Sequence, residues 1–381
     1  MKKIDFVFFD AGGGHRSAAD ALRLVIEQQQ RPWEVRLVNL QELLDSLDVF
    51  RKLTGRRLQD IYNLMLKKGW TLGSPQLTRL MQLVIRFYHR PQVRLLEDFW
   101  RHSRPDMVVS LVPNFNRALG QSLRNTAPAT PFVTVLTDLA DYPPHFWIER
   151  QEQFLVCGST RAVRQASALG HPEEHIFRTS GMILHPRFYE PISVDRQAER
   201  KRLGLNPDRP TGLVLFGGQG SQAMLEIAAR LDPAKLNLQL IFICGHNEKL
   251  FQALHHGRHR LRRFVEGFTA KVPYYMYLSD FFIGKPGPGS ISEALAMKLP
   301  VIVERNAWTL PQERYNADWI LEKGVGIVVR SFRNIAEAVR NLLVPARFAR
   351  CRANAAALDN RAVFEIPDIL HNILERTTCE N

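Results

Sequence analysis

The chain has 381 residues, of which 45% are hydrophobic, and this is enough for two domains and a large core that folds without disulfide bonds. The four cysteines (Cys157, Cys244, Cys351 and Cys379) are widely spaced, which favours a reducing compartment and argues against a disulfide framework or a metal cluster. No stretch approaches the roughly 20 apolar residues of a membrane-spanning helix, whereas the net charge of +13 requires an anionic partner or surface.

The first predicted element is an apolar strand over Ile4–Phe9, which runs into three glycines and a helix over about Ser17–Gln29. Two aspartates interrupt the apolar run, so we interpret it as a buried strand rather than a signal peptide. The turn Gly12–Gly14 would let main-chain N–H groups approach an anionic or polar ligand, and the helix adds the positive end of its dipole. His15 is the side chain of this turn that can move a proton near neutral pH.

A second strand, Glu34–Asn39, completes a βαβ unit of a parallel sheet, and a basic insertion follows at residues 51–104. The insertion carries twelve Lys and Arg residues against three Asp and Glu residues, an excess of nine positive charges. Aromatic residues are interleaved with these charges, and a set of apolar positions follows helical spacing: Leu77, Leu80, Met81, Val84 and Tyr88. Basic amphipathic helices with aromatic residues are typical of proteins that rest on an anionic lipid surface.

The basic segments allow other interpretations. The apolar stripe of the insertion could be ordinary core packing with a solvated basic face. Nucleic acid is disfavoured because the sequence has no helix-turn-helix signature, zinc-finger spacing or ribonucleoprotein motif. A second basic cluster, His255–Arg263, has no acidic or cysteine partner at ligand spacing, so we interpret it as a surface loop rather than a metal site.

The remaining strands predict two doubly wound domains. The first half continues with apolar runs at Asp106–Leu111, Phe132–Thr137 and Phe154–Val156, and prolines amid charged residues mark a boundary at about 185–210. The second half repeats the plan with strands at Gly212–Phe216, Leu238–Cys244, Phe281–Gly284, Pro300–Val303 and Gly326–Val329. We therefore expect two domains that face each other across a cleft, with ligands outside the carboxyl ends of the strands.

The densest motif is Phe282–Leu295, which predicts a strand, a glycine–proline turn and a helix. Its glycines expose N–H groups, and Ser290 is placed to cap the helix. Glu293 stands three residues later, which is capping-box spacing. The same carboxylate could instead hold the two hydroxyls of a ribose, and both interpretations stay open.

Three motifs in order resemble one family. Residues Gly12–Ala18 look like the Gly-Gly-Gly-His-Arg motif of the monogalactosyldiacylglycerol synthase and processive diacylglycerol glucosyltransferase family, relatives of the peptidoglycan enzyme that adds N-acetylglucosamine to lipid I. Residues Gly287–Ala294 look like the nucleotide-sugar motif of this family. A third block, Thr137–Leu139 followed by His145–Trp147, is similar except for a slightly different spacing. The resemblance spans Phe6 to about Val329.

The resemblance implies a GT-B fold of glycosyltransferase family 28, with an acceptor- and membrane-binding domain at 1–190, a UDP-sugar domain at 205–360, and a C-terminal helix at 361–381 that packs back on the first domain. The residues implied to bind the donor are Gly217, Gly218, Gln219, Gly220 and Ser221 at the diphosphate, Val265 and Phe268 at uracil, Gly287, Pro288, Gly289, Ser290 and Glu293 at the nucleotide, and Gln312, Glu313 and Asn316 at the hexose. Helix N-terminal polarity is the plain alternative for the last three. The residues expected at the acceptor or membrane are Gly13, Gly14, Trp70, Arg86, Arg90, His145 and Trp147.

Inverting sugar transfer needs a base for the acceptor hydroxyl and stabilisation of the leaving diphosphate. Glycine-loop amides and helix N-termini can hold the diphosphate, and without an Asp-x-Asp pair we expect no metal and no cofactor. We prefer His15 as the base because its unperturbed pKa is near 6.5. Asp138, at the end of a predicted strand, is the competing base, and it could instead orient His15 or cap a turn.

Taken together, the sequence predicts a glycosyltransferase that moves glucose or galactose from a UDP-sugar to diacylglycerol or a glycosyl-diacylglycerol, with no nucleic-acid partner. We expect it in the cytoplasm, peripheral on the inner face of the cell membrane. The alternatives are a polyprenyl-linked or soluble acceptor, a UDP-sugar 2-epimerase of the same fold, and a basic surface-binding protein without enzymatic activity.

Overall fold

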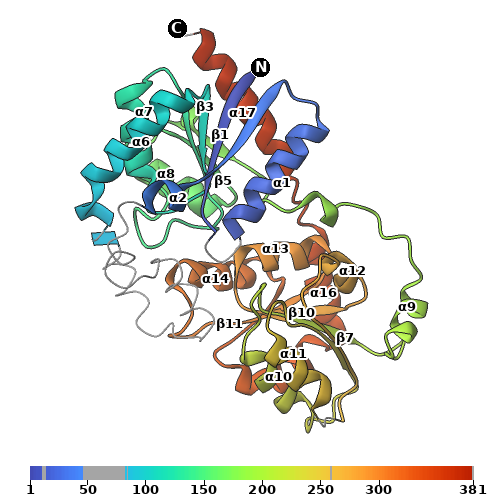
Figure 1. Ribbon diagram of the computed structural model, residues 1–381. Helices are drawn as coiled ribbons and strands as arrows, with labels where there is room; N and C mark the ends of the chain where they lie inside the picture. Colours follow the sequence, from blue (N-terminus) through green and yellow to red (C-terminus); the bar gives the residue numbers. More distant parts are fainter. Residues whose placement is uncertain (11–13, 46–81, 84, 258–259, 380–381) are drawn as a thin grey trace. The chain divides into compact units, whose positions relative to one another are not determined.

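The computed structural model describes residues 1–10, 14–45, 82–83, 85–257 and 260–379 (Figure 1). The described residues form two compact units. Unit 1 contains the chain up to Pro186 together with the segment from Asn360 onward, and unit 2 contains Arg187–Asp359. Gly13 and Trp70, like Leu77, Leu80, Met81 and Val84 of the predicted stripe, lie outside the described residues.

Unit 1 is built on a parallel six-stranded sheet with the order β2-β1-β3-β4-β5-β6. Its strands are β1 (Lys2–Phe8), β2 (Trp33–Asn39), β3 (Met107–Ser110), β4 (Phe132–Val135), β5 (Phe154–Cys157) and β6 (Ile176–Arg178). Its helices are α1 (Gly14–Gln28), α2 (Leu40–Leu44), α6 (His89–Ser103), α7 (Asn116–Thr126), α8 (Thr160–Ala168), α17 (Ala362–Cys379) and the short turns η2 (Glu173–His175) and η3 (Pro186–Phe188). Strands β1, β3 and β4 are apolar and buried along most of their length, as expected when helices cover both faces of a parallel sheet.

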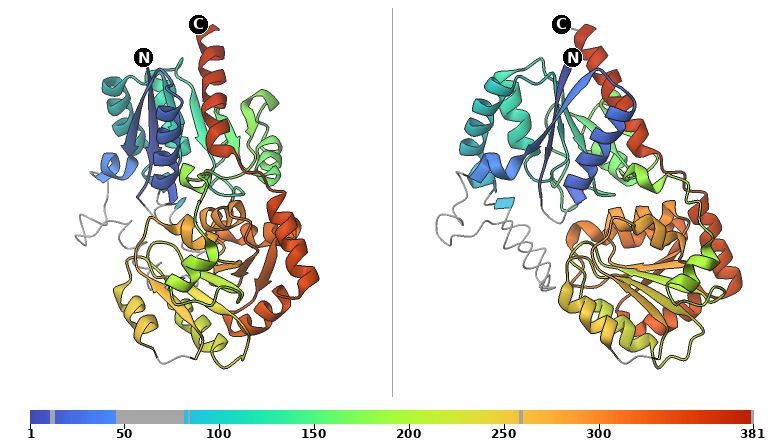
Figure 2. Two further views of the ribbon diagram at one scale, coloured as in Figure 1. Left: turned by 90° about the vertical axis from the view of Figure 1, so that its right-hand side faces the viewer. Right: turned by 45° about the vertical axis from the view of Figure 1, so that its right-hand side comes forward.

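Helices α6 and α7 pack together on one face of this sheet, and α1 and α17 lie side by side on the other (Figures 1 and 2). Trp100 is buried between α6 and α7, where its Nε1 donates a 2.8 Å hydrogen bond to Ser122 Oγ. Arg31, just beyond α1, forms an ion pair with Asp368 of α17. The final helix is thereby fastened to the first βαβ unit.

The segment that leaves unit 1 and the segment that returns to it are hydrogen-bonded to each other. The backbone N–H of Arg361 donates to Ser180 Oγ at 2.6 Å, and Asn360 Nδ2 donates to the carbonyl of Met182 at 2.9 Å. A Cβ at Gly181 would come within 2.6 Å of Asn360 Cγ, so this position requires glycine. The outgoing and returning segments are therefore locked together inside unit 1.

Unit 2 repeats the plan with a parallel sheet of order β12-β11-β10-β7-β8-β9. Its strands are β7 (Thr211–Leu215), β8 (Gln239–Ile243), β9 (Arg263–Glu266), β10 (Phe281–Gly284), β11 (Val301–Glu304) and β12 (Gly326–Val329). Its helices are α9 (Arg196–Arg202), α10 (Ala223–Leu231), α11 (Glu248–His256), α12 (Val272–Tyr277), α13 (Pro288–Ala296), α14 (Arg314–Lys323), α15 (Ile335–Leu342), α16 (Pro345–Ala356), η4 (Pro311–Glu313) and η5 (Phe332–Asn334). One apolar cluster packs under α10, α11 and α15, and another under α12, α13 and α14, so both faces of the sheet are covered (Figure 2).

The predicted α/β class with two doubly wound parallel sheets is confirmed. Two strands were missed, β6 and β9, because each is short and adjoins charged residues. The interpretation of His255–Arg263 as one surface loop is wrong at its ends, because His255 and His256 close α11 and Arg263 begins β9. Within the described residues, no helix combines the length and the apolar character needed to cross a membrane.

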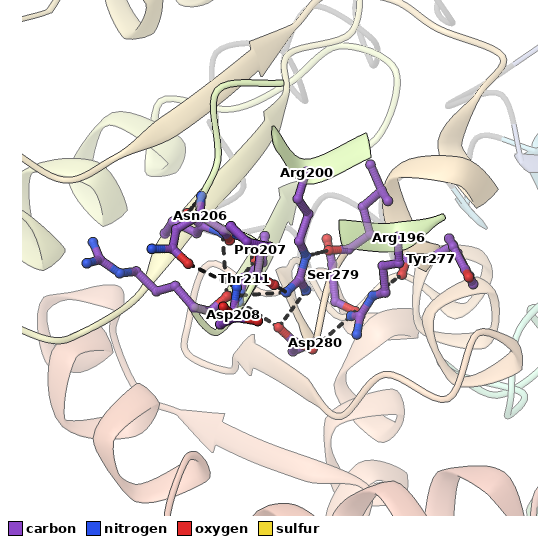
Figure 3. A network of polar contacts seen from close by, with 12 residues as sticks. Arg196, Arg200, Asn206, Pro207, Asp208, Thr211, Tyr277, Ser279 and Asp280 are labelled. Atoms are coloured by element: carbon purple, nitrogen blue, oxygen red, sulfur yellow. Dashed lines mark hydrogen bonds and ion pairs between the residues drawn. The ribbon is translucent and has the colours of Figure 1, made fainter. Parts of the chain in front are cut away.

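A buried ion network fastens α9 to the sheet of unit 2 (Figure 3). The Asp280 carboxylate accepts hydrogen bonds from Arg196 and Arg200, each at 2.8 Å, and from the backbone N–H of Thr211, also at 2.8 Å. Arg200 is only 4% exposed and also donates to the carbonyls of Leu278 and Pro207. Every charge in the network has a partner, which is the condition for a buried ion pair to be tolerated.

Replacing Asp280 by alanine should lower the free energy of unfolding by about 3–5 kcal/mol, because Arg200 would stay buried without its counter-ion. Asp98→Ala is the control, since Asp98 pairs with Arg101 at 2.6 Å on the exposed face of α6 and exposed pairs contribute about 0–1 kcal/mol. Urea denaturation of both variants measures the difference. Equal losses in the two variants would contradict a structural role for the network.

Candidate active site

His15 lies at the point where the strand order of unit 1 reverses. Strand β1 lies between β2 and β3, so the chain segments after β1 and β3 diverge and leave a crevice at the carboxyl ends of the strands. Helix α1 begins at Gly14, which puts His15 in its first turn, and His15 Nδ1 lies 3.1 Å from Thr137 Oγ1 beyond β4. The ring also hydrogen-bonds the backbone of Leu111 beyond β3. Three strand ends thus converge on one imidazole.

Burial of the imidazole lowers the pKa of His15 to about 4, against the opposing effect of its hydrogen bond to the Leu111 backbone. Part of the residue remains exposed to solvent. The ring is therefore neutral at pH 7, which is the state that can accept a proton from a substrate hydroxyl.

Asp138, the competing candidate base, is held by a tryptophan. Trp147 Nε1 donates to Asp138 Oδ2 at 2.9 Å, and Asp138 is only 7% exposed. Trp147 itself is completely buried, with its ring 5.9 Å from that of His15. Trp147 was expected at the acceptor or membrane, but its ring packs inside unit 1, where it offers no exposed surface and positions Asp138.

The loop that carries His145 and Trp147 is organised by Asp141. One carboxylate oxygen of Asp141 accepts from the N–H of Trp147 at 2.6 Å, and the other accepts from the N–H of His145 at 3.1 Å. His145 is partly exposed, and its Nδ1 lies 3.6 Å from Glu149 Oε2. Unlike Trp147, His145 is thus accessible to a ligand of unit 1.

In unit 2 the strand order reverses between β7 and β10, and a glycine loop follows each of these neighbouring strands. Leu215 of β7 pairs with Gly284 of β10, so both loops start at the same edge of the sheet. Such a pair of loops at a switch point is a common binding position for phosphate groups.

The first loop, Gly217–Ser221, leads into α10. Gly217 and Gly220 have φ angles of +72° and +61°, which favour glycine. A Cβ at Gly217 or Gly218 would meet no atom within 4 Å, so the backbone of these residues is open to a ligand. A backbone hydrogen bond fixes the loop, because the N–H of His246 donates to the Gly218 carbonyl at 2.8 Å.

The second loop ends at the N-terminus of α13. Helix α13 begins at Pro288 with Gly287 as its N-cap, so the prediction that Ser290 caps the helix is wrong, and Glu293 is not part of a capping box. Gly289 lies in the first turn with no atom within 4 Å of a Cβ position. First-turn N–H groups have no intrahelical partners, so they can bind an anion.

Glu293 projects from the next turn of α13 and remains partly exposed. Burial raises the pKa of Glu293 to about 7, and the charge of Arg187 opposes this shift. The group is thus close to half-protonated at neutral pH, so it can both accept and donate hydrogen bonds. A carboxyl group in this state can hold the two hydroxyls of a ribose, and the ribose interpretation stays a prediction.

The three residues predicted to contact the hexose differ in access. Asn316 is completely buried and donates through Nδ2 to the Pro286 carbonyl at 2.7 Å. Glu313 is 7% exposed and forms a 2.7 Å ion pair with Lys285. Asn316 therefore supports the glycine–proline loop and is not a surface for the sugar, whereas Gln312 keeps partial exposure.

The predicted uracil site contains one buried and one exposed residue. Val265 belongs to β9 and is 8% exposed. Phe268 is 64% exposed, and its ring stacks on His246 at 3.9 Å with an interplanar angle of 18°. His246, Lys285 and Thr137 were not predicted as site residues, although Lys285 stands inside the motif Gly-Lys-Pro-Gly and Thr137 opens the third family motif.

The described part of the basic insertion presents an exposed stripe. Leu83 and Phe87 are 61% and 82% exposed, and Arg86, Arg90 and Arg94 are exposed with them. Their spacing of three and four residues puts them on one side of a helix. The apolar and basic side chains of this surface thus point to solvent rather than into the core.

Comparison with known proteins agrees with this geometry. Residues 213–373 match the glycosyltransferase family 28 C-terminal domain. The match covers most of unit 2 and the beginning of the segment that returns to unit 1. The resemblance inferred from the three motifs is thereby confirmed, and the chain is a glycosyltransferase.

Full-length relatives extend the match to both units. The chain is 27% identical over 402 residues to the probable monogalactosyldiacylglycerol synthase 2 of Oryza sativa subsp. indica, covering 98% of this chain and 81% of the relative. It is also 27% identical to monogalactosyldiacylglycerol synthase 1 of Arabidopsis thaliana, covering 98% of this chain and 72% of the relative.

Solved structures with the same fold are more distant in sequence. MurG of Acinetobacter baumannii superposes with a TM-score of 0.64 at 13% identity, covering 98% of this chain and 100% of that one. MnaA of S. aureus, in a co-structure with UDP, superposes with a TM-score of 0.63 at 17% identity, covering 98% and 97%. The GT-B fold of this chain is therefore shown.

The His15 imidazole should stay neutral down to about pH 4 in the folded protein. The unfolded chain binds a proton at this residue below about pH 6.5, so His15 should make folding less stable as the pH falls from 7 towards 4. NMR titration of the imidazole resonances, with His15→Gln to assign the signal, tests this. A midpoint near 6.5 would show that the ring is not shielded from water.

Proposed function

We propose that this glycosyltransferase transfers a hexose, glucose or galactose, from a UDP-sugar to diacylglycerol at the surface of an anionic membrane. The observation that carries the proposal is the full-length similarity to monogalactosyldiacylglycerol synthases, which covers 98% of the chain. The two glycine loops of unit 2 and the neutral His15 of unit 1 supply the chemistry that such a transfer needs. Repeated transfer to the glycosylated product belongs to the same proposal.

Unit 2 would bind the donor through backbone groups. The open backbone of Gly217 and Gly218 and the first turn of α13 at Gly289 offer N–H donors to a diphosphate. Dipoles and amides of this kind stabilise the negative charge that develops on a leaving phosphate. In the described part of the chain no group of three or more His, Cys, Asp or Glu residues is placed to hold a metal ion, and we propose a transfer that depends on amides instead.

His15 would be the general base. Its low pKa keeps the ring neutral throughout the physiological range, so the ring is ready to take the proton of the acceptor hydroxyl. Asp138 is less suited to act as the base, because one of its oxygens accepts a hydrogen bond from Trp147 Nε1 and little of the residue is exposed. We assign Asp138 a positioning role beside His15.

The hexose would lie near the beginning of α14. Of the three residues predicted there, Gln312 is the one that keeps partial exposure, while Glu313 and Asn316 contact the Lys285–Pro286 turn. We therefore expect Gln312 to contribute to the choice between glucose and galactose, and Glu313 and Asn316 to act through the loop.

The exposed stripe Leu83, Arg86, Phe87, Arg90 and Arg94 would rest on the membrane. Apolar side chains insert among the lipid chains, and arginines contact anionic head groups. We place the protein in the cytoplasm, peripheral on the inner face of the cell membrane. A polyprenyl-linked acceptor at the same surface is the second candidate; a soluble acceptor would leave this stripe without a use.

Purified protein incubated with each UDP-hexose and anionic vesicles containing diacylglycerol should form a hexosyl-diacylglycerol, identified by mass spectrometry. His15→Ala should lower turnover by the roughly 10²- to 10⁴-fold that loss of a general base costs, while calorimetry still detects UDP binding. Transfer to a polyprenyl carrier instead of diacylglycerol would favour the second candidate. Unchanged turnover in His15→Ala would remove His15 from the mechanism.

The double variant Leu83→Ser/Phe87→Ser should bind anionic vesicles at least tenfold more weakly, because burying each large apolar side chain is worth roughly 1.5–3 kcal/mol. Leu321→Ser is the matched control, since Leu321 is an exposed leucine (57%) on α14 of unit 2 and is not part of the stripe. Vesicle flotation measures both. If the double variant floats as well as the control, the stripe is not the membrane contact.

A further inference from the structure

A narrow polar pocket in unit 1 has no role in the steps described so far. It lies where α6, α7 and the loop after β4 meet, and it is lined by Gln82, Ile85, Arg86, His89, Gln92, Asn114, Arg117, Ala118, His145 and Glu149. Most of these are polar or charged side chains. The pocket opens outward, and its base has room for a group about the size of one water molecule or hydroxyl.

The clearest sign that the pocket takes a ligand is Gln92. This residue is 6% exposed, and its Oε1 is shielded from solvent yet has no hydrogen-bond partner in the part of the chain that the structure describes. A buried amide oxygen left unpaired costs about 1–3 kcal/mol. Native proteins seldom keep such a group unless a ligand, an ion or a water satisfies it.

A second unsatisfied atom lies at the same pocket. Among the described residues His145 Nδ1 is buried without a hydrogen bond, and the 3.6 Å that separates it from Glu149 Oε2 is too long for one. The Glu149 side chain is only 15% exposed. Burial raises the pKa of Glu149, and His145, Arg117 and Arg86 oppose this shift. Glu149 thus lines the pocket without a direct hydrogen bond to His145.

The chemistry of the unsatisfied atoms selects the ligand. Gln92 Oε1 accepts hydrogen bonds and cannot donate, and a Glu149 carboxylate has the same polarity. Arg86 and Arg117 also line the pocket and would attract a phosphate, but a fully ionised phosphate brings only further acceptors and no donor for Gln92 Oε1. A hydroxyl brings a donor for this oxygen or for Glu149 and can also accept a hydrogen bond. The unpaired Gln92 oxygen therefore matches a hydroxyl-bearing group.

The pocket and His15 belong to the same edge of the sheet. The N–H of Asn114, which lines the pocket, donates to the Phe146 carbonyl at 2.5 Å, and Trp147 follows with its ring 5.9 Å from that of His15. The parallel strands β1, β3 and β4 end at this edge. A ligand of the pocket would therefore bind at the same edge of the sheet as the candidate base.

We propose that this pocket binds a hydroxyl of the uncharged head group of the acceptor, with Gln92 and Glu149 as the hydrogen-bond acceptors. The inference rests on the proposed function for the identity of the acceptor as a lipid. A glycerol hydroxyl and a hexose hydroxyl share the required chemistry. In the second case the pocket would hold the product of one transfer as the acceptor of the next.

The test uses the full chain and soluble head-group mimics: glycerol, glucosylglycerol and galactosylglycerol, with glycerol 3-phosphate as the charged comparison. Calorimetry should detect binding of at least one uncharged mimic, and Gln92→Leu and Glu149→Gln should each weaken it about tenfold or more. Asp98→Asn, on the exposed face of α6, should leave it unchanged. UDP binding should be the same in all variants, and thermal unfolding confirms that each variant is folded.

The mimics also separate the two sources, because binding of glycerol alone indicates the glycerol and preference for a glycosylglycerol indicates the hexose. Stronger binding of glycerol 3-phosphate, or binding that persists in Gln92→Leu, would overturn the proposal. The absence of binding by every mimic would also overturn the proposal, because the pocket would then hold only water. Mimic binding that depends on Gln92 without hexose transfer to any lipid would refute the proposed function and leave the pocket assignment standing.

Discussion

The site chemistry of this protein depends on how a buried parallel strand must end. A strand covered on both faces leads through a tight turn into a helix, and the first N–H groups of that helix have no intrahelical partners. Where the strand order reverses, two such turns diverge and leave their groups uncovered. This occurs between β1 and β3 in unit 1 and between β7 and β10 in unit 2. His15, the Gly217–Ser221 loop and the first turn of α13 all stand at these two edges.

Burial near these edges favours the neutral state of the titratable groups. It lowers the pKa of His15 to about 4 and raises that of Glu293 to about 7. Neither group therefore carries its full usual charge beside a helix N-terminus. For a diphosphate this matters, because a fully ionised carboxylate close to the first turn of α13 would oppose the attraction of the free N–H groups. By linkage, His15 lowers the stability of the fold as the pH falls from about 6.5 towards 4, and Glu293 lowers it as the pH rises from about 4.5 towards 7.

The fold was predictable from the sequence because both sheets are nearly uninterrupted apolar runs separated by glycine turns. Ile4–Phe9 and Phe281–Gly284 could hardly be anything but buried strands, and glycine loops after them follow from the geometry of the class. Strands β6 and β9 were missed since their few residues adjoin charges. The positions of the glycine loops were therefore predictable, while their exact caps were not, as Ser290 shows.

Side-chain roles were less predictable, because burial is decided by segments far apart in the chain. Trp147 and Asn316 read as binding residues by their neighbours in sequence, yet both are completely buried and support the loops around them. Gln92 gave no signal at all, since an amide on an amphipathic helix is ordinary until its partners are known. Only the packing of α6 against α7 and the loop after β4 shows that its oxygen is unpaired.

The two units consequently offer opposite hydrogen-bond polarity. The loops of unit 2 present N–H donors and the end of a helix dipole, which suit an anion that leaves with negative charge. The pocket of unit 1 presents buried acceptor oxygens, which suit a neutral hydroxyl. A transferase that moves a sugar from a phosphate to an alcohol must distinguish these two partners. Backbone donors in unit 2 suit the phosphate, and side-chain acceptors in unit 1 suit the alcohol.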